Sequence, residues 1–133
     1  MKRKPNRKSW ITSQLRRLSL RWPPRGKVLK ASRRELPRKI KKDGTPFKKP
    51  NYEYQCNVCK GWFRSSDTQL DHIQPVIDVK SDKFTEEEFY STFVIGLFCY
   101  EDNFQVICHK CHDEKCKIEQ KERFSVKKLD TSD

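Results

Sequence analysis

The sequence predicts an α+β fold with a small core, and three observations indicate it. Two Cys-x-x-Cys pairs lie far apart in the chain, at Cys56/Cys59 and Cys108/Cys111. Residues 68–73 alternate in polarity as a short strand does, and the segment from His109 to about Arg123 is charged and lacks Gly and Pro, as expected of an exposed helix. Strand, connection, strand and helix therefore form the expected core, which a helical basic N-terminal arm precedes.

Charge separates this arm from the core. Residues 1–49 hold 19 of the 30 Lys and Arg residues and two of the 18 acidic residues, a net charge of +17, whereas residues 50–133 carry −5. A basic segment joined to a mildly acidic domain is typical of an appendage that grips nucleic-acid phosphates. We therefore expect a nucleic-acid-binding arm and linker at 1–49, a core domain at 50–124 and a mobile tail at 125–133.

The first part of the arm is predicted to be a helix. Ser9 is the expected N-cap, and the helix is expected to run to about Arg21, with Trp10, Leu18 and other apolar side chains near one stripe. Trp22-Pro23-Pro24 is expected to end it, because proline breaks the hydrogen-bond ladder. Trp22 itself either stacks on a base or packs against Leu18 or the core.

The rest of the arm is predicted to be a second helix and a linker. The helix is expected from Gly26 to about Leu36, and three prolines with six Lys or Arg residues mark 37–50 as extended. One interpretation is that the arm is a solvated surface that binds other molecules nonspecifically. We favour contact with the DNA backbone. The candidate nucleic-acid-binding residues are Arg16, Arg17, Arg21, Arg25, Lys27, Lys30, Arg33 and Arg34.

The four paired cysteines are the ligand set of a structural zinc site. Zn²⁺ prefers tetrahedral sulfur and nitrogen ligands, and each Cys-x-x-Cys turn places two sulfurs on one side of the ion. The start Met1–Lys4 leads into no apolar segment, so we expect a reducing cytoplasm, in which such pairs bind metal more often than they oxidise. The alternative is disulfides or unrelated buried thiols. With 34% hydrophobic and 36% charged residues the core is thin, so zinc is expected to be needed for folding.

Two further cysteines lie outside these pairs. Cys99 lies in an apolar stretch and is expected in the core. Cys116 follows His112 by four residues, so the two share a helix face; Cys116 is either an incidental neighbour or a metal ligand.

A second group of polar residues consists of Asp71, His72, Asn103 and His112. If the Asp71 carboxylate and the His112 imidazole were the only protein ligands of a metal ion, the ion would keep open coordination positions. Alternation along a strand sends Asp71 and His72 to opposite faces, although a kink before Pro75 could bring them together. Local roles remain as alternatives: Asp71 or Asn103 in turns or caps, and His112 as a neighbour of the zinc site.

Residues 85–98 are predicted to form an inserted helix. Thr85 and Glu88 have the spacing of a capping box. The apolar side chains expected on one face are Phe89, Phe93 and Leu97. This face is either core or a partner surface, and an exposed face could pair two copies of the chain.

Residues 50–123 resemble the HNH (ββα-metal) nucleases, in the treble-clef, four-cysteine branch that is widespread in bacteriophages. The matching segments are Cys56-Asn57-Val58-Cys59, Asp71-His72-Ile73-Gln74-Pro75, Asn103-Phe104-Gln105-Val106-Ile107-Cys108 and Cys111-His112. Motif order and content agree with the family, as does the step from Asn103 to His112. The step from His72 to Asn103 is about twice that of compact members, which we interpret as an insertion.

The resemblance implies a metal-dependent endonuclease that hydrolyses DNA phosphodiester bonds. His72 would be the general base, and Asn103 would hold the histidine ring or its loop in place. Asp71 and His112 would hold one divalent ion, Mg²⁺, Mn²⁺ or another transition metal, at the scissile phosphate. Structural Zn²⁺ would occupy the four-cysteine site.

The leading alternative is a noncatalytic zinc-finger protein that binds DNA or RNA through its arm, and a protein-interaction adaptor is the third hypothesis. The expected partner is DNA, and a second copy of the chain or a phage protein could join it. The sequence has no candidate membrane span, so no membrane partner is expected. The expected compartment is the cytoplasm, in a bacterial host if a phage encodes the chain.

Overall fold

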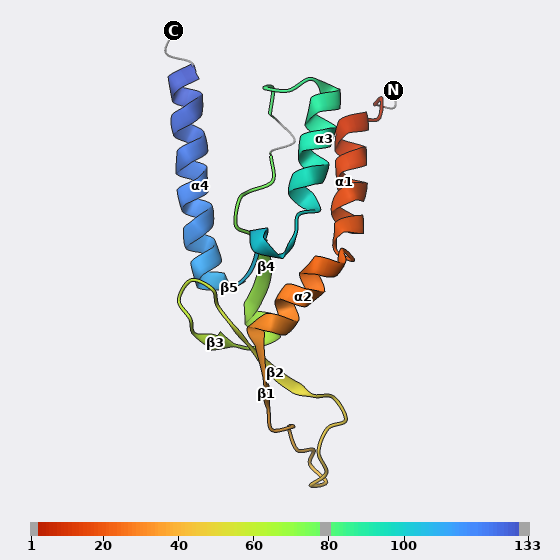
Figure 1. Ribbon diagram of the computed structural model, residues 1–133, viewed down its shortest axis with the longest axis vertical. Helices are drawn as coiled ribbons and strands as arrows, with labels where there is room; N and C mark the ends of the chain where they lie inside the picture. The colour runs from red at the N-terminus through yellow and green to blue at the C-terminus, as the bar shows by residue number, and fades with distance from the viewer. Residues whose placement is uncertain (1–2, 78–80, 131–133) are drawn as a thin grey trace. The chain divides into compact units, whose positions relative to one another are not determined.

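The computed structural model describes residues 3–77 and 81–130, and describes side chains as far as residue 122. Within those residues the fold is α+β, as the sequence predicts (Figure 1). A three-stranded sheet has the order β1-β2-β3 and a two-stranded sheet pairs β4 with β5. The helices are α1 (Arg7–Ser19), α2 (Pro23–Ser32), α3 (Glu86–Leu97) and α4 (His109–Asp130). The strands are β1 (Arg33–Leu36), β2 (Asn51–Gln55), β3 (Trp62–Phe63), β4 (Thr68–His72) and β5 (Phe104–Cys108).

The chain divides into two compact units, and each unit combines two separate stretches of sequence. Unit 1 comprises residues 1–31 and 72–105, and unit 2 comprises 32–71 and 106–133. The chain therefore passes from one unit to the other three times: at the end of α2, within β4 between Asp71 and His72, and within β5.

Unit 1 has its core on α3. The side chains of Phe89, Phe93 and Leu97 are buried, which confirms that the apolar face of the inserted helix is core. The capping box is also confirmed: the Thr85 hydroxyl accepts from the Glu88 backbone N–H, and the Glu88 carboxylate accepts from that of Thr85. The helix is thus fixed at its first turn and by its buried face.

Helix α1 differs from the prediction in its cap and in its buried face. The N-cap is Asn6, whose Oδ1 accepts from the Ser9 backbone N–H at 3.1 Å, so the helix begins before Ser9. Trp10 and Leu18 are more than 60% exposed. The buried residues of the helix are Thr12 and Ser19, and Leu15, another residue of the predicted stripe, packs against the core on α3. The Thr12 hydroxyl donates to the carbonyl of Lys8 at 2.8 Å. A small, internally bonded hydroxyl can be buried at little cost.

The prediction of the second helix, from Gly26 to about Leu36, is wrong at both boundaries. Helix α2 begins at Pro23, because proline in the first turn lacks only an N–H that has no partner there. It ends at Ser32, and residues 33–36 form β1, which pairs antiparallel with β2 from Arg33↔Tyr54 to Leu36↔Asn51. Strand pairing, which a local pattern does not contain, overrides helix propensity in these residues.

Trp22 packs inside unit 1, one of the alternatives left open by the sequence. Its indole Nε1 donates to the Cys99 carbonyl at 2.6 Å. Its ring contacts Phe98 edge-on and Tyr100 at a tilt, with centroids 5.8 and 6.0 Å away. An indole held by its only donor and two rings fixes the end of α1 within its unit.

Unit 2 contains the β1-β2-β3 sheet and α4. The predicted linker at 37–50 is a connection between paired strands: the chain leaves β1, turns back and returns as β2. Helix α4 begins at His109, as predicted, and continues past Arg123 to Asp130. Residues 125–130 of the predicted tail thus belong to this helix, and 131–133 lie outside the described residues.

Candidate metal centre and polar clusters

The four paired cysteines form one cluster in unit 2. Their sulfur atoms all lie within 4.8 Å of one another, and Cys59 Sγ lies 4.0 Å from Cys108 Sγ. A tetrahedral Zn²⁺ with bonds of about 2.3 Å separates its sulfur ligands by about 3.8 Å. The donor set and its spacing therefore fit a structural metal ion such as zinc, which supports the sequence prediction.

The first cysteine pair lies in a tight turn after β2. The Cys56 backbone N–H donates to Gly61 O at 2.9 Å, and the Lys60 N–H donates to Cys56 O at 3.0 Å. The Cys59 N–H points at Cys56 Sγ, 3.5 Å away, and Lys60 has a φ of 62°. A Cβ on Gly61 would lie 2.9 Å from the Phe63 ring, so glycine lets the chain pass closely beneath the turn.

The second cysteine pair joins a strand to a helix. Cys108 is the last residue of β5, and Cys111 lies in the first turn of α4. The positive end of the helix dipole favours negative charge here. Ile107 is fully buried beside Cys56, Cys108 and Cys111, and Phe63 packs against this group, whereas Cys59 is exposed.

The thiols of the cluster differ in their acidity. Burial opposes ionisation of Cys56, but backbone N–H groups of Cys108, Cys59 and Val58 outweigh it and lower its pKa to about 6. Hydrogen bonding to Cys108, with burial and the neighbouring sulfurs, raises the pKa of Cys111 to about 12. One thiolate therefore forms readily and discourages the next, a repulsion that a bound cation would offset.

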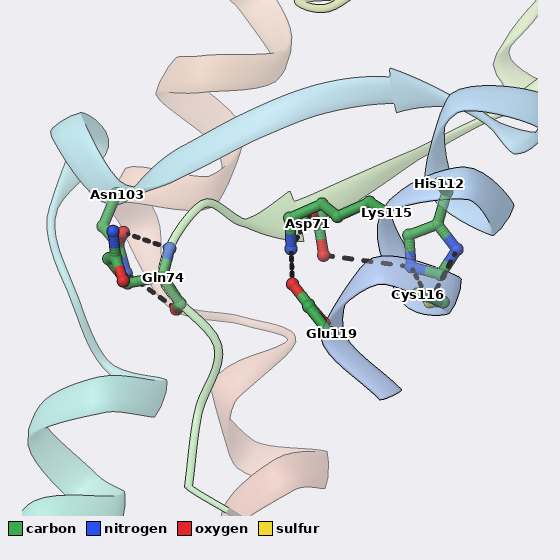
Figure 2. A network of polar contacts seen from close by, with 7 residues as sticks. All are labelled: Asp71, Gln74, Asn103, His112, Lys115, Cys116 and Glu119. Atoms are coloured by element: carbon green, nitrogen blue, oxygen red, sulfur yellow. Dashed lines mark hydrogen bonds and ion pairs between the residues drawn. The ribbon is translucent and has the colours of Figure 1, made fainter. Parts of the chain in front are cut away.

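A second polar cluster in unit 2 contains Asp71 and His112. His112 Nε2 lies 3.9 Å from Asp71 Oδ1, and their side chains are 30% and 14% exposed (Figure 2). Cys116 Sγ lies 3.6 Å from His112 Nε2 and 3.7 Å from Nδ1, which confirms that Cys116 and His112 share a helix face. One carboxylate oxygen and one imidazole nitrogen, both accessible, could hold a divalent cation.

Sequence reasoning missed two charged members of this cluster. Lys115 Nζ lies 3.0 Å from Asp71 Oδ2 and also contacts the Glu119 carboxylate. Burial opposes the charge of Lys115, but Glu119 and Asp71 outweigh it and raise its pKa. The signal was available: Lys115 and Glu119 follow His112 by three and seven residues, which places all three on one helix face.

His72 and Asn103 belong to unit 1. His72 Nε2 lies 3.3 Å from Leu97 O, and its ring lies 4.9 Å from that of Phe104. Asn103 Oδ1 accepts from the Gln74 N–H at 2.8 Å, and Nδ2 donates to Gln74 O at 3.4 Å (Figure 2). The Asn103 carbonyl also accepts from the Ile73 N–H at 2.8 Å. Asn103 therefore fixes the two residues that follow His72.

The remaining cysteine, Cys99, lies outside the metal cluster. It is half-buried, and burial raises the pKa of its thiol, the largest of several influences. The prediction that Cys99 lies in the core is not confirmed, because it is half-buried and belongs to neither core cluster.

The predicted nucleic-acid-binding residues fall in both units, and five of the eight contact side chains of their own unit. These contacts join Arg16 to Phe93, Arg25 to Phe104, Lys27 to Glu101, Arg33 to Tyr52 and Arg34 to Glu53. Arg17, Arg21 and Lys30 have exposed side chains. The five thus have structural contacts of their own, and the other three face solvent.

Comparisons with protein-family models, with curated proteins and with solved structures find no match to this chain. Among the described residues, none of the helices is both long enough and apolar enough to span a membrane.

Proposed function

We propose that the protein is a metal-dependent DNA endonuclease of the HNH type. The observation that carries this proposal is the pairing of Asp71, on β4, with His112, in the first turn of α4, at 3.9 Å. These residues are 41 positions apart, and the proposed nuclease site requires them together. The four-cysteine cluster between β2 and α4 supports the same proposal, because it would fix the start of the helix that carries His112.

In this proposal Asp71 and His112 hold a divalent ion. When bound, that ion would supply Lewis-acid stabilisation of charge at the scissile phosphate and the departing oxygen. Asp71 supplies a hard oxygen and His112 a nitrogen, a set that accepts Mg²⁺, Mn²⁺ or a later transition metal. Lys115 would have to release Asp71 Oδ2 for the carboxylate to bind the ion with both oxygens.

His72 would act as general base on the attacking water. Its Nε2 lies 3.3 Å from the carbonyl oxygen of Leu97, and a carbonyl can only accept a hydrogen bond. This contact favours the neutral tautomer with the proton on Nε2, so Nδ1 is the nitrogen that would take the proton. Asn103, by bonding both backbone groups of Gln74, would hold the loop that follows the base.

The basic arm supports a DNA substrate. Residues 1–49 carry a net charge of +17, and Arg17, Arg21 and Lys30 present exposed cations that could contact phosphates. Binding of this kind weakens steeply with salt.

Cleavage of supercoiled plasmid tests the proposal. Zinc-loaded protein is incubated with Mg²⁺, Mn²⁺ or EDTA, beside His72→Ala and the matched control His109→Ala, which changes an exposed histidine outside the proposed site. We expect metal-dependent nicked or linear product, a rate about 10²- to 10⁴-fold lower in His72→Ala, and little change in His109→Ala. Equal rates in the two variants would refute the assignment of His72.

A noncatalytic zinc-dependent nucleic-acid-binding protein is the second candidate. The observation that favours it is the ion pair between Asp71 and Lys115, which already neutralises the carboxylate that an ion would need. Retained DNA binding with no product under any ion, on plasmid and on phage genomic DNA, would support this candidate over the enzyme.

A further inference from the structure

The connection between β1 and β2, residues 37–50, is an ordered ribbon, which we call the β1–β2 arm. Figure 1 shows it leaving the end of the paired strands and returning to them. Ile40 and Pro46 form an isolated antiparallel bridge, beside which the Phe47 N–H donates to Lys39 O at 2.8 Å. These hydrogen bonds make residues 39–47 a short antiparallel hairpin of its own, separate from the β1–β2 ladder.

The tip of this arm is closed by a specific turn. The Lys41 N–H donates to Thr45 O at 2.8 Å, and Gly44 adopts a φ of 87°, which favours glycine. Asp43 Oδ1 accepts from both the Thr45 backbone N–H at 2.9 Å and its hydroxyl at 2.6 Å. The hydroxyl bond and then the backbone bond lower the pKa of Asp43. The only acidic side chain of the arm is thus engaged in its turn.

The arm is strongly cationic and wholly exposed. Every residue from 37 to 50 is exposed, and the net charge of the segment is +5. Its basic residues are Arg38, Lys39, Lys41, Lys42, Lys48 and Lys49. Apart from Asp43, no acidic side chain of the arm offsets them, so its charge is directed outward toward an anionic partner.

The arm also exposes two large apolar side chains. Ile40 is 70% exposed and Phe47 is 45% exposed, although they lie on the two strands of the bridge region. Lys41 Nζ lies 5.9 Å from the Phe47 ring centroid, so cation and ring occupy the same surface. The arm therefore presents a cation and an aromatic ring side by side to an incoming partner.

We infer that the β1–β2 arm binds double-stranded DNA, with its ribbon in the major groove. A two-stranded ribbon fits that groove, whereas lysines along its edges reach the flanking phosphates. Phe47, which lies on the same face of the ribbon as Lys41, then contacts thymine methyl groups, which are the apolar features of the groove. This inference rests on the proposed function for its partner, DNA, and it assigns residues that the proposed nuclease site does not use.

Fluorescence anisotropy with a labelled DNA duplex tests the arm, using full-length zinc-loaded protein without added divalent cation so that binding is measured apart from cleavage. The triple variant Lys39/Lys41/Lys42→Gln is expected to bind about tenfold more weakly at 0.15 M salt, and to lower the slope of log affinity against log salt by about 2.7. Phe47→Ser is expected to weaken binding about threefold without changing that slope. Methyl green, a major-groove ligand, is expected to compete with the protein, and netropsin, a minor-groove ligand, is not.

A matched triple variant on α4, Lys110/Lys117/Lys121→Gln, removes the same charge from exposed positions and is expected to change affinity less than about twofold. Equal losses of DNA affinity in the two triple variants, or unchanged affinity in the β1–β2 arm variant, would refute DNA binding by this arm. The nuclease proposal would then still be tested by the plasmid assay. Competition by netropsin alone would overturn the major-groove placement. Absence of duplex binding by the wild-type protein would overturn both proposals.

Discussion

Lys115 Nζ lies 3.0 Å from Oδ2 of Asp71, on the carboxylate that the proposed nuclease site assigns to a divalent ion. The same ammonium contacts Glu119 one turn further along α4. A lysine in this position supplies one positive charge where a divalent ion would supply two. An ion that bound both carboxylate oxygens would therefore compete with Lys115 for Oδ2.

Replacement of Lys115 by Met is expected to strengthen Mn²⁺ binding to zinc-loaded protein by up to about fivefold, because a partly exposed ion pair contributes about 1 kcal/mol at most. Electron paramagnetic resonance of free Mn²⁺ measures the affinity. Lys117→Met, which changes an exposed lysine on the same helix, is the control. Weaker Mn²⁺ binding in Lys115→Met would mean that the lysine orients Asp71 instead of competing for it.

Asn103 provides a test of the loop that follows His72. Asn103→Ala removes the acceptor of the Gln74 N–H and the donor to the Gln74 carbonyl, and is expected to destabilise the loop by about 1 kcal/mol and to slow plasmid cleavage. Asn103→Asp keeps the acceptor, so it should retain more activity than Asn103→Ala. Equal rates for the two variants, with unchanged His72 titration by NMR, would exclude a role for this hydrogen bond in positioning.

From the four-cysteine cluster we expect two Cys→Ser substitutions to differ strongly in zinc content and in thermal unfolding. Cys56→Ser removes a buried ligand and is expected to lose bound zinc and the cooperative unfolding transition of unit 2, since a structural zinc site contributes free energy of folding directly. Cys99→Ser changes a thiol outside the cluster and should keep both. Metal analysis by mass spectrometry and thermal unfolding measure these outcomes. Full zinc content in Cys56→Ser would contradict the assigned ligand set.

We expect the ion pair between Arg7 and Glu86, within unit 1, to depend on pH. Arg7 donates to both Glu86 oxygens, at 2.7 and 2.8 Å, and chiefly for this reason the Glu86 pKa falls from 4.5 to about 2. A depressed folded-state pKa means that the contribution to stability is complete above about pH 4.5 and is lost as the pH falls toward 2.

Arg7→Gln is therefore expected to raise the Glu86 pKa toward 4.5, as measured by NMR titration of its carboxyl carbon. Arg17→Gln, which removes an exposed charge from the same helix, should leave it unchanged. An unaltered Glu86 pKa in Arg7→Gln would show that the pair does not persist in solution.

Local signals predicted the elements that hold the candidate site. Alternation predicted a strand at 68–73, one residue longer than β4 at Thr68–His72. The Thr85/Glu88 spacing located the start of α3, and the Cys-x-x-Cys spacing predicted that the four sulfurs lie together. The strand and the capping box depend on residues close in sequence, and the metal site depends on the spacing within each Cys-x-x-Cys pair. Such features can be read without knowing tertiary contacts.

Features that depend on distant residues were missed. Residues 33–36 resemble a helix locally and become β1 because β2 offers hydrogen-bond partners about 20 positions later. Trp10, Leu15 and Leu18 suggested an apolar stripe on α1. Leu15 packs on the core, but Trp10 and Leu18 are exposed, and the buried residues are Thr12 and Ser19. Helical spacing places Lys115 on the face of His112, but its contact with Asp71 also depends on β4 and α4 coming together.

All four candidate metal ligands belong to unit 2, although residues 72–105 of unit 1 lie between the two cysteine pairs in sequence. A metal ion at these sulfurs would close the same covalent loop whatever the length of that segment. The entropic cost of closing a loop rises only logarithmically with its length, about 0.6 kcal/mol for each doubling. Evolution or engineering can therefore replace whole helices in the segment between the cysteine pairs while the four-cysteine metal site is retained.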